Sequence, residues 1–85
     1  MKIVIEINNE KIPVTIPKNA VQVFPEIHIE GSTKVEIEGV MHSVWASVPC
    51  DKNGIADSDA QALVQVYDIP TGALIHWQYA AVIEE

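Results

Sequence analysis

Hydrophobic and polar residues alternate along most of this chain, which is the pattern of strands with one buried face. Near the N-terminus, isoleucine occupies positions 3, 5 and 7, and apolar residues recur at positions 12, 14 and 16. We expect strands over 3–7 and 12–16 to pair as a hairpin around 8–11, with Ile7 opposite Ile12. Pro13 lacks an N–H group, so we expect its strand to lie at a sheet edge.

The alternation continues through the middle and the C-terminal half of the chain. Apolar positions 21, 23, 27 and 29 predict a third strand over 21–29, interrupted at Pro25. A turn over 30–33 then returns the chain as a fourth strand that contains Val35 and Ile37, so that Glu30 lies opposite Lys34. Further strands are expected over 40–48, 62–69 and 74–83. The last two are joined by a turn over 68–72, where proline and glycine favour the required φ angles.

Short strands separated by glycine, proline and asparagine predict an all-β fold. We expect a compact β-sandwich or small barrel of about seven mainly antiparallel strands. The composition agrees, because the chain has 12 isoleucines and 11 valines but only two leucines. Branched side chains of this kind pack well on pleated sheets. Eighty-five residues are expected to form a single domain, residues 1–85.

Charge and cysteine content narrow the class of function. The net charge is −7, with five lysines and no arginine, which argues against direct nucleic-acid binding. No apolar run approaches the ~20 residues of a membrane-spanning helix, and the acidic, alternating N-terminus does not read as a signal peptide. Cys50 is the only cysteine and forms no intrachain disulfide. We expect a cytoplasmic protein, or one packaged in a virion assembled in the cytoplasm.

The loop after the fifth predicted strand suggests calcium. Four of its residues supply oxygen ligands within a short span: Asp51, Asn53, Asp57 and Asp59. The pattern nevertheless departs from the EF-hand, since glycine falls at position four, Ile55 at position five and Ala62 at position twelve. We therefore expect a polar surface loop, with a calcium site as the alternative.

No residue pattern predicts catalysis. Three histidines, at positions 28, 42 and 76, lie in three predicted strands without another ligand at a diagnostic spacing. Cys50 is followed by Asp51, whose charge opposes formation of a thiolate. The four glycines are isolated at turns and form no phosphate-binding loop. We predict a protein that is not an enzyme and that carries no cofactor and no dedicated metal site.

The last predicted strand is apolar on both faces. One face has Ile75, Trp77, Tyr79, Ala81 and Ile83, and the other has Leu74, Ala80 and Val82. Such a strand is either central in the fold or covered by another molecule. Core packing is the favoured explanation for Trp77 and Tyr79. The alternative is a subunit interface, in which Trp45 joins these two aromatic residues as an anchor.

A second predicted surface is acidic. Glu26, Glu30, Glu36 and Glu38 fall on one side of the third and fourth predicted strands, with only Lys34 opposing them. Solubility and protection of strand edges explain such a face, and docking of a basic partner is the functional alternative.

These features predict a non-enzymatic protein-interaction or assembly module that forms a homo-oligomer. It would be an accessory structural subunit of a larger complex such as a virion. The predicted contact residues are Trp45, Trp77, Tyr79, Glu30, Glu36 and Glu38. One alternative is a small acidic inhibitor of a partner with a basic site, such as a nuclease-type host defence protein opposed by a mobile element. Another is a calcium-stabilised binding module.

Overall fold

The computed structural model describes residues 1–17, 19–23, 26–53, 55–56 and 60–84. Its strands are β1 (Lys2–Ile7), β2 (Glu10–Thr15), β3 (Asn19–Val23), β4 (Glu26–Ile37), β5 (Val40–Cys50), β6 (Gln61–Asp68) and β7 (Leu74–Glu84). The described residues contain no helix, which confirms the predicted all-β class. In particular, no helix in these ranges has the length and apolar character needed to cross a membrane.

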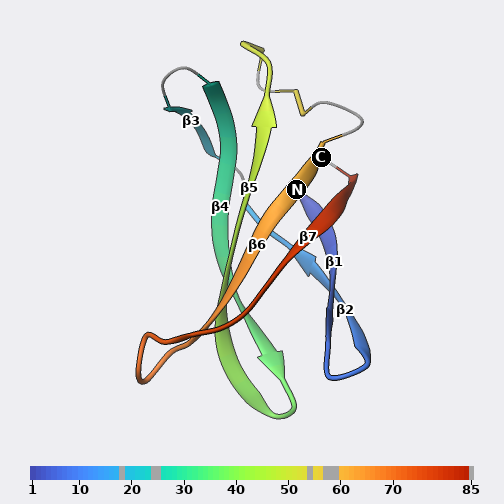
Figure 1. Ribbon diagram of the computed structural model, residues 1–85, viewed down its shortest axis with the longest axis vertical. Coiled ribbons are helices and arrows are strands. Elements are labelled where there is room, and N and C mark those ends of the chain that lie inside the picture. Colours follow the sequence, from blue (N-terminus) through green and yellow to red (C-terminus); the bar gives the residue numbers. More distant parts are fainter. Residues whose placement is uncertain (18, 24–25, 54, 57–59, 85) are drawn as a thin grey trace.

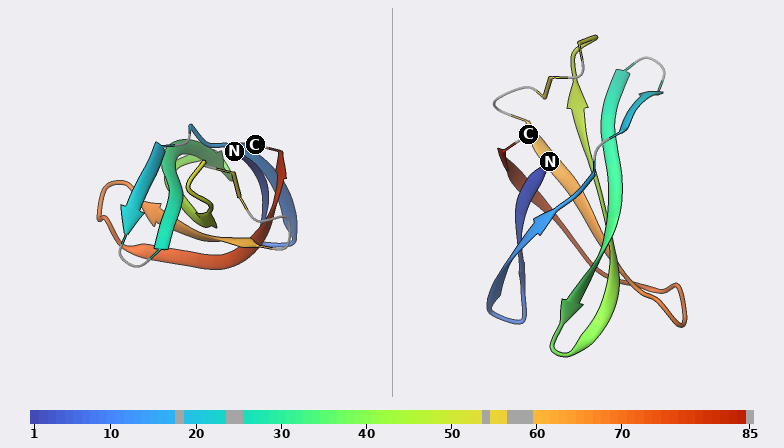
Figure 2. Two further views of the ribbon diagram at one scale, coloured as in Figure 1. Left: turned by 90° about the horizontal axis from the view of Figure 1, so that it is seen from above. Right: turned by 180° about the vertical axis from the view of Figure 1, so that it is seen from behind.

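The strands form one antiparallel sheet in the order β2-β1-β7-β6-β5-β4-β3 (Figure 1). β2 and β3 follow each other in the sequence but lie at opposite ends of this order. Because only residues 16–18 connect them, the sheet must curl until its two edges approach each other. Figure 2 shows the resulting half-barrel from above and from behind.

The end of the first hairpin packs against β4, where the curled sheet closes on itself. Met1 and Ile16 extend the β1–β2 pairing by one pair: Ile16 donates its N–H to the Met1 carbonyl at 2.8 Å, and the N-terminal ammonium of Met1 donates to the Ile16 carbonyl at 2.9 Å. The next residue, Pro17, lies so close to β4 that a Cβ atom built on Gly31 would be 1.8 Å from its carbonyl oxygen. The connection between β2 and β3 therefore packs directly against β4, and only glycine fits at this position of β4.

The interior of the half-barrel is filled by aliphatic side chains. Buried residues come from β1, β2, β4, β5, β6, β7 and the flanking segments: Met1, Ile3, Ile5, Val14, Ile16, Ile29, Ile37, Val44, Ala46, Val48, Ala62, Val64, Val66 and Ala80. No aromatic side chain is buried among the residues that the structure describes. Among the described residues, His42 is the one buried polar side chain. Its Nδ1 lies 2.9 Å from the Val40 carbonyl oxygen.

The register of the first hairpin differs from the prediction. Ile7 lies opposite Glu10, and Ile12 lies opposite Ile5 instead of Ile7. Asn8 and Asn9 form a two-residue turn with φ angles of 54° and 64°, which asparagine adopts more readily than most residues. The predicted buried face is nevertheless right, because a shift of two residues leaves each side chain on the same side of the sheet.

The predicted strand over 21–29 and turn over 30–33 are both wrong. Val23 lies opposite Glu26, so this segment forms a hairpin of two strands, β3 and β4. β4 then continues through the predicted turn to Ile37, and Lys34 lies opposite Ser43 of β5 instead of Glu30. Gly31 stays within the strand because its role is the close approach of Pro17 rather than a turn conformation.

The turn between β6 and β7 agrees with the prediction. Gly72 has a φ of 71° and donates its N–H to the Asp68 carbonyl at 2.8 Å. Thr71 donates its N–H and its hydroxyl to Asp68 Oδ2, at 3.2 and 2.6 Å. This network joins β6 and β7 as neighbours and sets which residues of the two strands lie side by side.

Candidate functional site

The outer face of β7 carries a line of exposed apolar side chains, here called the apolar stripe: Ile75, Trp77, Tyr79, Ala81 and Ile83. Trp77 is 57% exposed and Tyr79 is 60% exposed. The favoured sequence interpretation, that these aromatic residues pack in the core, is therefore wrong for this chain. The alternate residues face inward, and Ala80 among them is buried. Aliphatic side chains fill the interior of the curled sheet, and the aromatic residues of β7 lie on the convex side.

Strand pairing extends the stripe across two more strands. Gln65 of β6 lies opposite Trp45 of β5 on one side and Trp77 of β7 on the other. Leu63 lies opposite Tyr79 in the adjacent row. The rings of Trp77 and Tyr79 meet edge to face, with centroids 5.9 Å apart and an interplanar angle of 89°. This arrangement is favourable for aromatic rings and orders both side chains before any partner binds.

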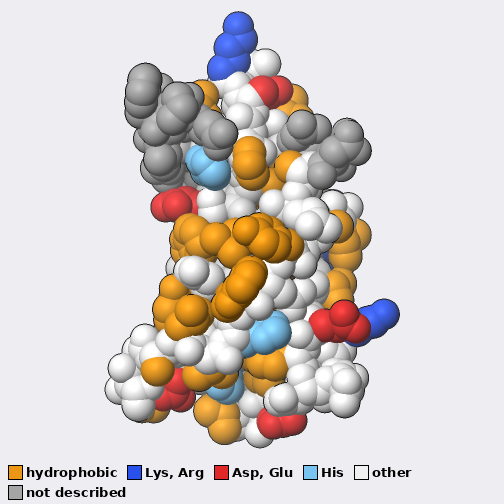
Figure 3. Space-filling model, in the orientation of Figure 1, with side chains coloured by type: hydrophobic (Ala, Val, Ile, Leu, Met, Phe, Trp, Pro, Cys, Tyr) orange, Lys and Arg blue, Asp and Glu red, His pale blue; other side chains and the backbone are white. Residues whose placement is uncertain are grey.

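The outer side of β5 and β6, beside the stripe, has no charged side chain. By strand alternation its members are Met41, Ser43, Trp45, Ser47, Gln61, Leu63, Gln65 and Tyr67. With the stripe they form what we call the uncharged face. Its polar groups bond to one another, as where the Tyr67 hydroxyl donates to Gln65 Oε1 at 2.6 Å. Figure 3 shows hydrophobic side chains gathered in a band over the middle of the sheet, with acidic and basic groups at its margins.

The acidic residues are spread along one strand rather than opposed across two. Glu30 and Glu36 lie on the outer side of β4, separated by six residues, or about 20 Å of extended chain. Glu38 lies in the turn between β4 and β5, with a φ of 52°, and Lys34 lies between the other two. The compact acidic face predicted from the sequence depended on the wrong register of these strands.

The histidines occupy three separate environments. His28 Nδ1 is 3.2 Å from Ser47 Oγ on the outer side of the sheet, whereas His42 is buried inside. His76 Nε2 is 2.9 Å from Gln78 Oε1, which also accepts the N–H of Glu6 at 2.9 Å and so bridges β7 to β1. Within the described ranges, no group of three or more histidine, cysteine or acidic side chains is placed to hold a metal ion.

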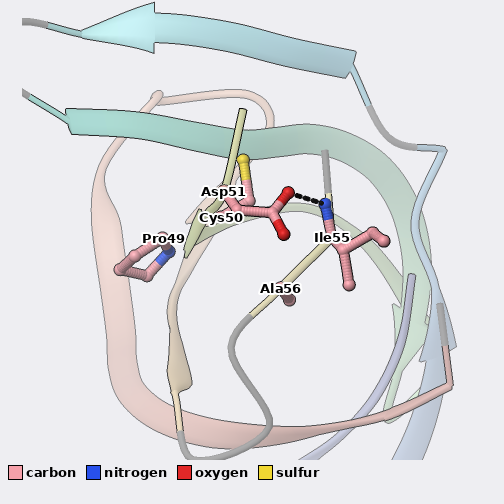
Figure 4. A pocket seen from close by; sticks show the side chains of 5 residues that line it. All are labelled: Pro49, Cys50, Asp51, Ile55 and Ala56. Carbon is pink, nitrogen blue, oxygen red and sulfur yellow. Dashed lines mark hydrogen bonds between the residues drawn. The ribbon is translucent and has the colours of Figure 1, made fainter. Parts of the chain in front are cut away.

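Asp51 shapes the first described residues of the loop after β5. Asp51 Oδ1 accepts the backbone N–H groups of Asn53 and Ile55, at 2.8 and 3.0 Å. These bonds shape an open cavity of about 340 Å³ lined by Pro49, Cys50, Asp51, Ile55 and Ala56 (Figure 4). This use of an aspartate oxygen is typical of a turn. Asp57 and Asp59 lie outside the described residues, so the calcium site stays a prediction.

Comparison with protein-family models, with curated proteins and with solved structures gave no match to this chain. The candidate site is therefore defined by its own geometry, which brings Trp45, Trp77 and Tyr79 onto one face and places Glu30 and Glu36 along its edge, on the neighbouring strand β4. Sequence reasoning missed two residues of β6: Gln65, which lies between Trp45 and Trp77, and Leu63, which lies beside Tyr79. The short turn between β6 and β7 was the available signal, because strands joined by short turns are usually neighbours.

Proposed function

We propose that this chain is a non-enzymatic protein-association module that binds a protein partner through the uncharged face. The observation that supports the proposal most is the exposure of Trp77 and Tyr79 on the convex side of the sheet. Each of these side chains keeps roughly 100–150 Å² of surface in water, given the size of aromatic residues. Covering that surface favours association by about 3 kcal/mol for each side chain, at about 25 cal/mol per Å².

The predicted sandwich belongs to the same proposal. A partner sheet packed on the uncharged face would supply a second layer at about 10 Å, the usual spacing of two packed sheets. The protein would then act as an accessory structural subunit of a larger complex, such as a virion assembled in the cytoplasm. The acidic-inhibitor alternative is supported less, because Glu30 and Glu36 are too far apart to form a dense array of negative charge.

The test compares two charged variants in native cell extract, where any partner is present. Trp77→Glu places a carboxylate in the apolar stripe of the uncharged face, whereas Thr15→Glu adds the same charge at an exposed position of β2. We expect the wild-type chain and Thr15→Glu to elute from a sizing column well above the mass of a 9.4 kDa monomer. Trp77→Glu should elute as a folded monomer, with folding checked on purified protein by circular dichroism. A folded Trp77→Glu variant that keeps the full complex size would contradict the proposal.

A further inference from the structure

We infer that the partner on the uncharged face is a second copy of this chain. The two β7 strands pack face to face and antiparallel, about a two-fold axis that passes near Tyr79. This inference rests on the proposed function for the choice of surface and adds the identity of the partner and its orientation.

The distribution of charge favours a second copy. The chain carries a net charge of −7, so two copies repel each other over most of their surface. Over β5, β6 and β7 the outer face carries no charged side chain, so two copies can meet there without like charges inside the contact. The charged side chains nearest to it lie on the two flanking strands, Lys2 and Glu6 on β1 and Glu30, Lys34 and Glu36 on β4. A basic partner would rely on acidic groups within the contact, and these three strands supply none. Salt should therefore strengthen the association by screening the repulsion, whereas it would weaken binding of a basic partner.

The order of side chains along the stripe is complementary to itself. Reading outward from Tyr79, the next positions are Trp77 on one side and Ala81 on the other, and the ends are Ile75 and Ile83. A two-fold axis at Tyr79 places Trp77 of each copy against Ala81 of the other. A large side chain then meets a small one, as close packing requires, and the same contact occurs twice.

The size of the face fits a reversible dimer. Three strands spaced about 4.8 Å apart, over the length of β7, give a footprint of roughly 500 Å² for each copy. Specific interfaces bury about 800 Å² for each partner, and weaker ones bury less than about 600 Å². The dimer should therefore dissociate on dilution, at protein concentrations that sedimentation equilibrium can follow.

The test exploits the pairing of Trp77 with Ala81. Trp77→Ala leaves two alanines facing each other and should weaken self-association of the purified protein about tenfold or more, as truncation of an aromatic anchor does. Ala81→Trp makes two tryptophans collide and should also weaken it. An equal mixture of these two variants should form a heterodimer close in affinity to the wild type, since each introduced residue then meets its size complement. Both changes lie on exposed positions outside the core, and Thr15→Ala serves as the control for an exposed position off the face.

Sedimentation equilibrium separates the outcomes. Recovery of dimer in the mixture, with each single variant deficient, supports the two-fold arrangement. A wild-type chain that stays monomeric at all concentrations and salt levels overturns the inference. The native-extract experiment would then be the remaining test of the proposed function. Two deficient variants that fail to recover when mixed, or an Ala81→Trp variant that associates more tightly than the wild type, would also overturn the antiparallel pairing.

Discussion

Replacing Gly31 by alanine tests the contact that holds the half-barrel in its curled shape. An added Cβ would lie 1.8 Å from the Pro17 carbonyl oxygen, 2.9 Å from Ile16 Cγ2 and 3.0 Å from the Pro17 carbonyl carbon. An ordinary carbon–oxygen contact is about 3.3 Å, so the connecting segment would have to retreat by about 1.5 Å. The obstacle is mainly backbone, which cannot rotate out of the way as a flexible side chain would.

The expected cost follows from what that retreat disturbs. Ile16 is fully buried, and two hydrogen bonds tie its backbone to Met1. Overpacking in a well-filled interior costs about 1–3 kcal/mol. Loss of the two hydrogen bonds adds about 0.5–1.5 kcal/mol each. We therefore expect Gly31→Ala to lower the free energy of unfolding by about 2–6 kcal/mol. A chain of this length has about 4–13 kcal/mol in total.

Urea unfolding followed by circular dichroism measures this cost. The matched control is Ser32→Ala, at the next position of β4, where the side chain is exposed and the change should stay within about 0.5 kcal/mol. Gly31→Ala should unfold at a much lower urea concentration or fail to fold. A Gly31→Ala protein with the same midpoint as Ser32→Ala would refute the placement of the connecting segment against β4.

Three further substitutions test separate parts of the fold by the same unfolding assay. Glu38→Asn should stabilise the protein by roughly 0.5–1 kcal/mol, because Glu38 has a φ of 52° beside Gly39 and asparagine with glycine favours such a turn. A loss of stability would contradict this turn geometry. Asp51→Ala should lower the free energy of unfolding by about 1 kcal/mol, because it removes the two exposed hydrogen bonds that Asp51 Oδ1 accepts from backbone N–H groups. Millimolar calcium should leave the wild-type melting temperature unchanged, and a rise of several degrees would favour the calcium site instead. Val64→Ala should cost about 2 kcal/mol at a fully buried position, whereas Val40→Ala, at a position 52% exposed, should cost less than about 0.5 kcal/mol. Equal losses of unfolding free energy in Val64→Ala and Val40→Ala would contradict the assignment of Val64 to the inner face.

Much of the fold was predictable from the sequence because side chains alternate with a period of two. That period identified the inner face of β1 and β2, yet it could not set their register, since a shift of two residues leaves the pattern unchanged. The turn decided the register, through the positive φ angles of Asn8 and Asn9. Gly31 was misread as a turn residue because a glycine needed for close packing looks the same in sequence as one needed for a turn.

The candidate site was predictable only as a choice between two faces of β7. Both faces are apolar in sequence, and a strand of that kind is usually central in a fold, which made Trp77 and Tyr79 look like core residues. The curvature of the sheet decided otherwise, because the concave side accommodates residues such as Val64 and Ala80. Curvature arises from the short connection between β2 and β3 at opposite edges of the sheet, which is a long-range feature that local patterns do not contain.

The most direct test of association through the uncharged face is the solution mass of the purified wild-type protein. Light scattering after size-exclusion chromatography should be recorded over a wide range of protein concentration, at low and at high salt. We expect the mass to rise from 9.4 kDa toward twice that value with concentration. The rise should occur at lower protein concentration when salt screens the net charge of −7. A mass that stays at 9.4 kDa under all these conditions would contradict self-association through Trp77 and Tyr79.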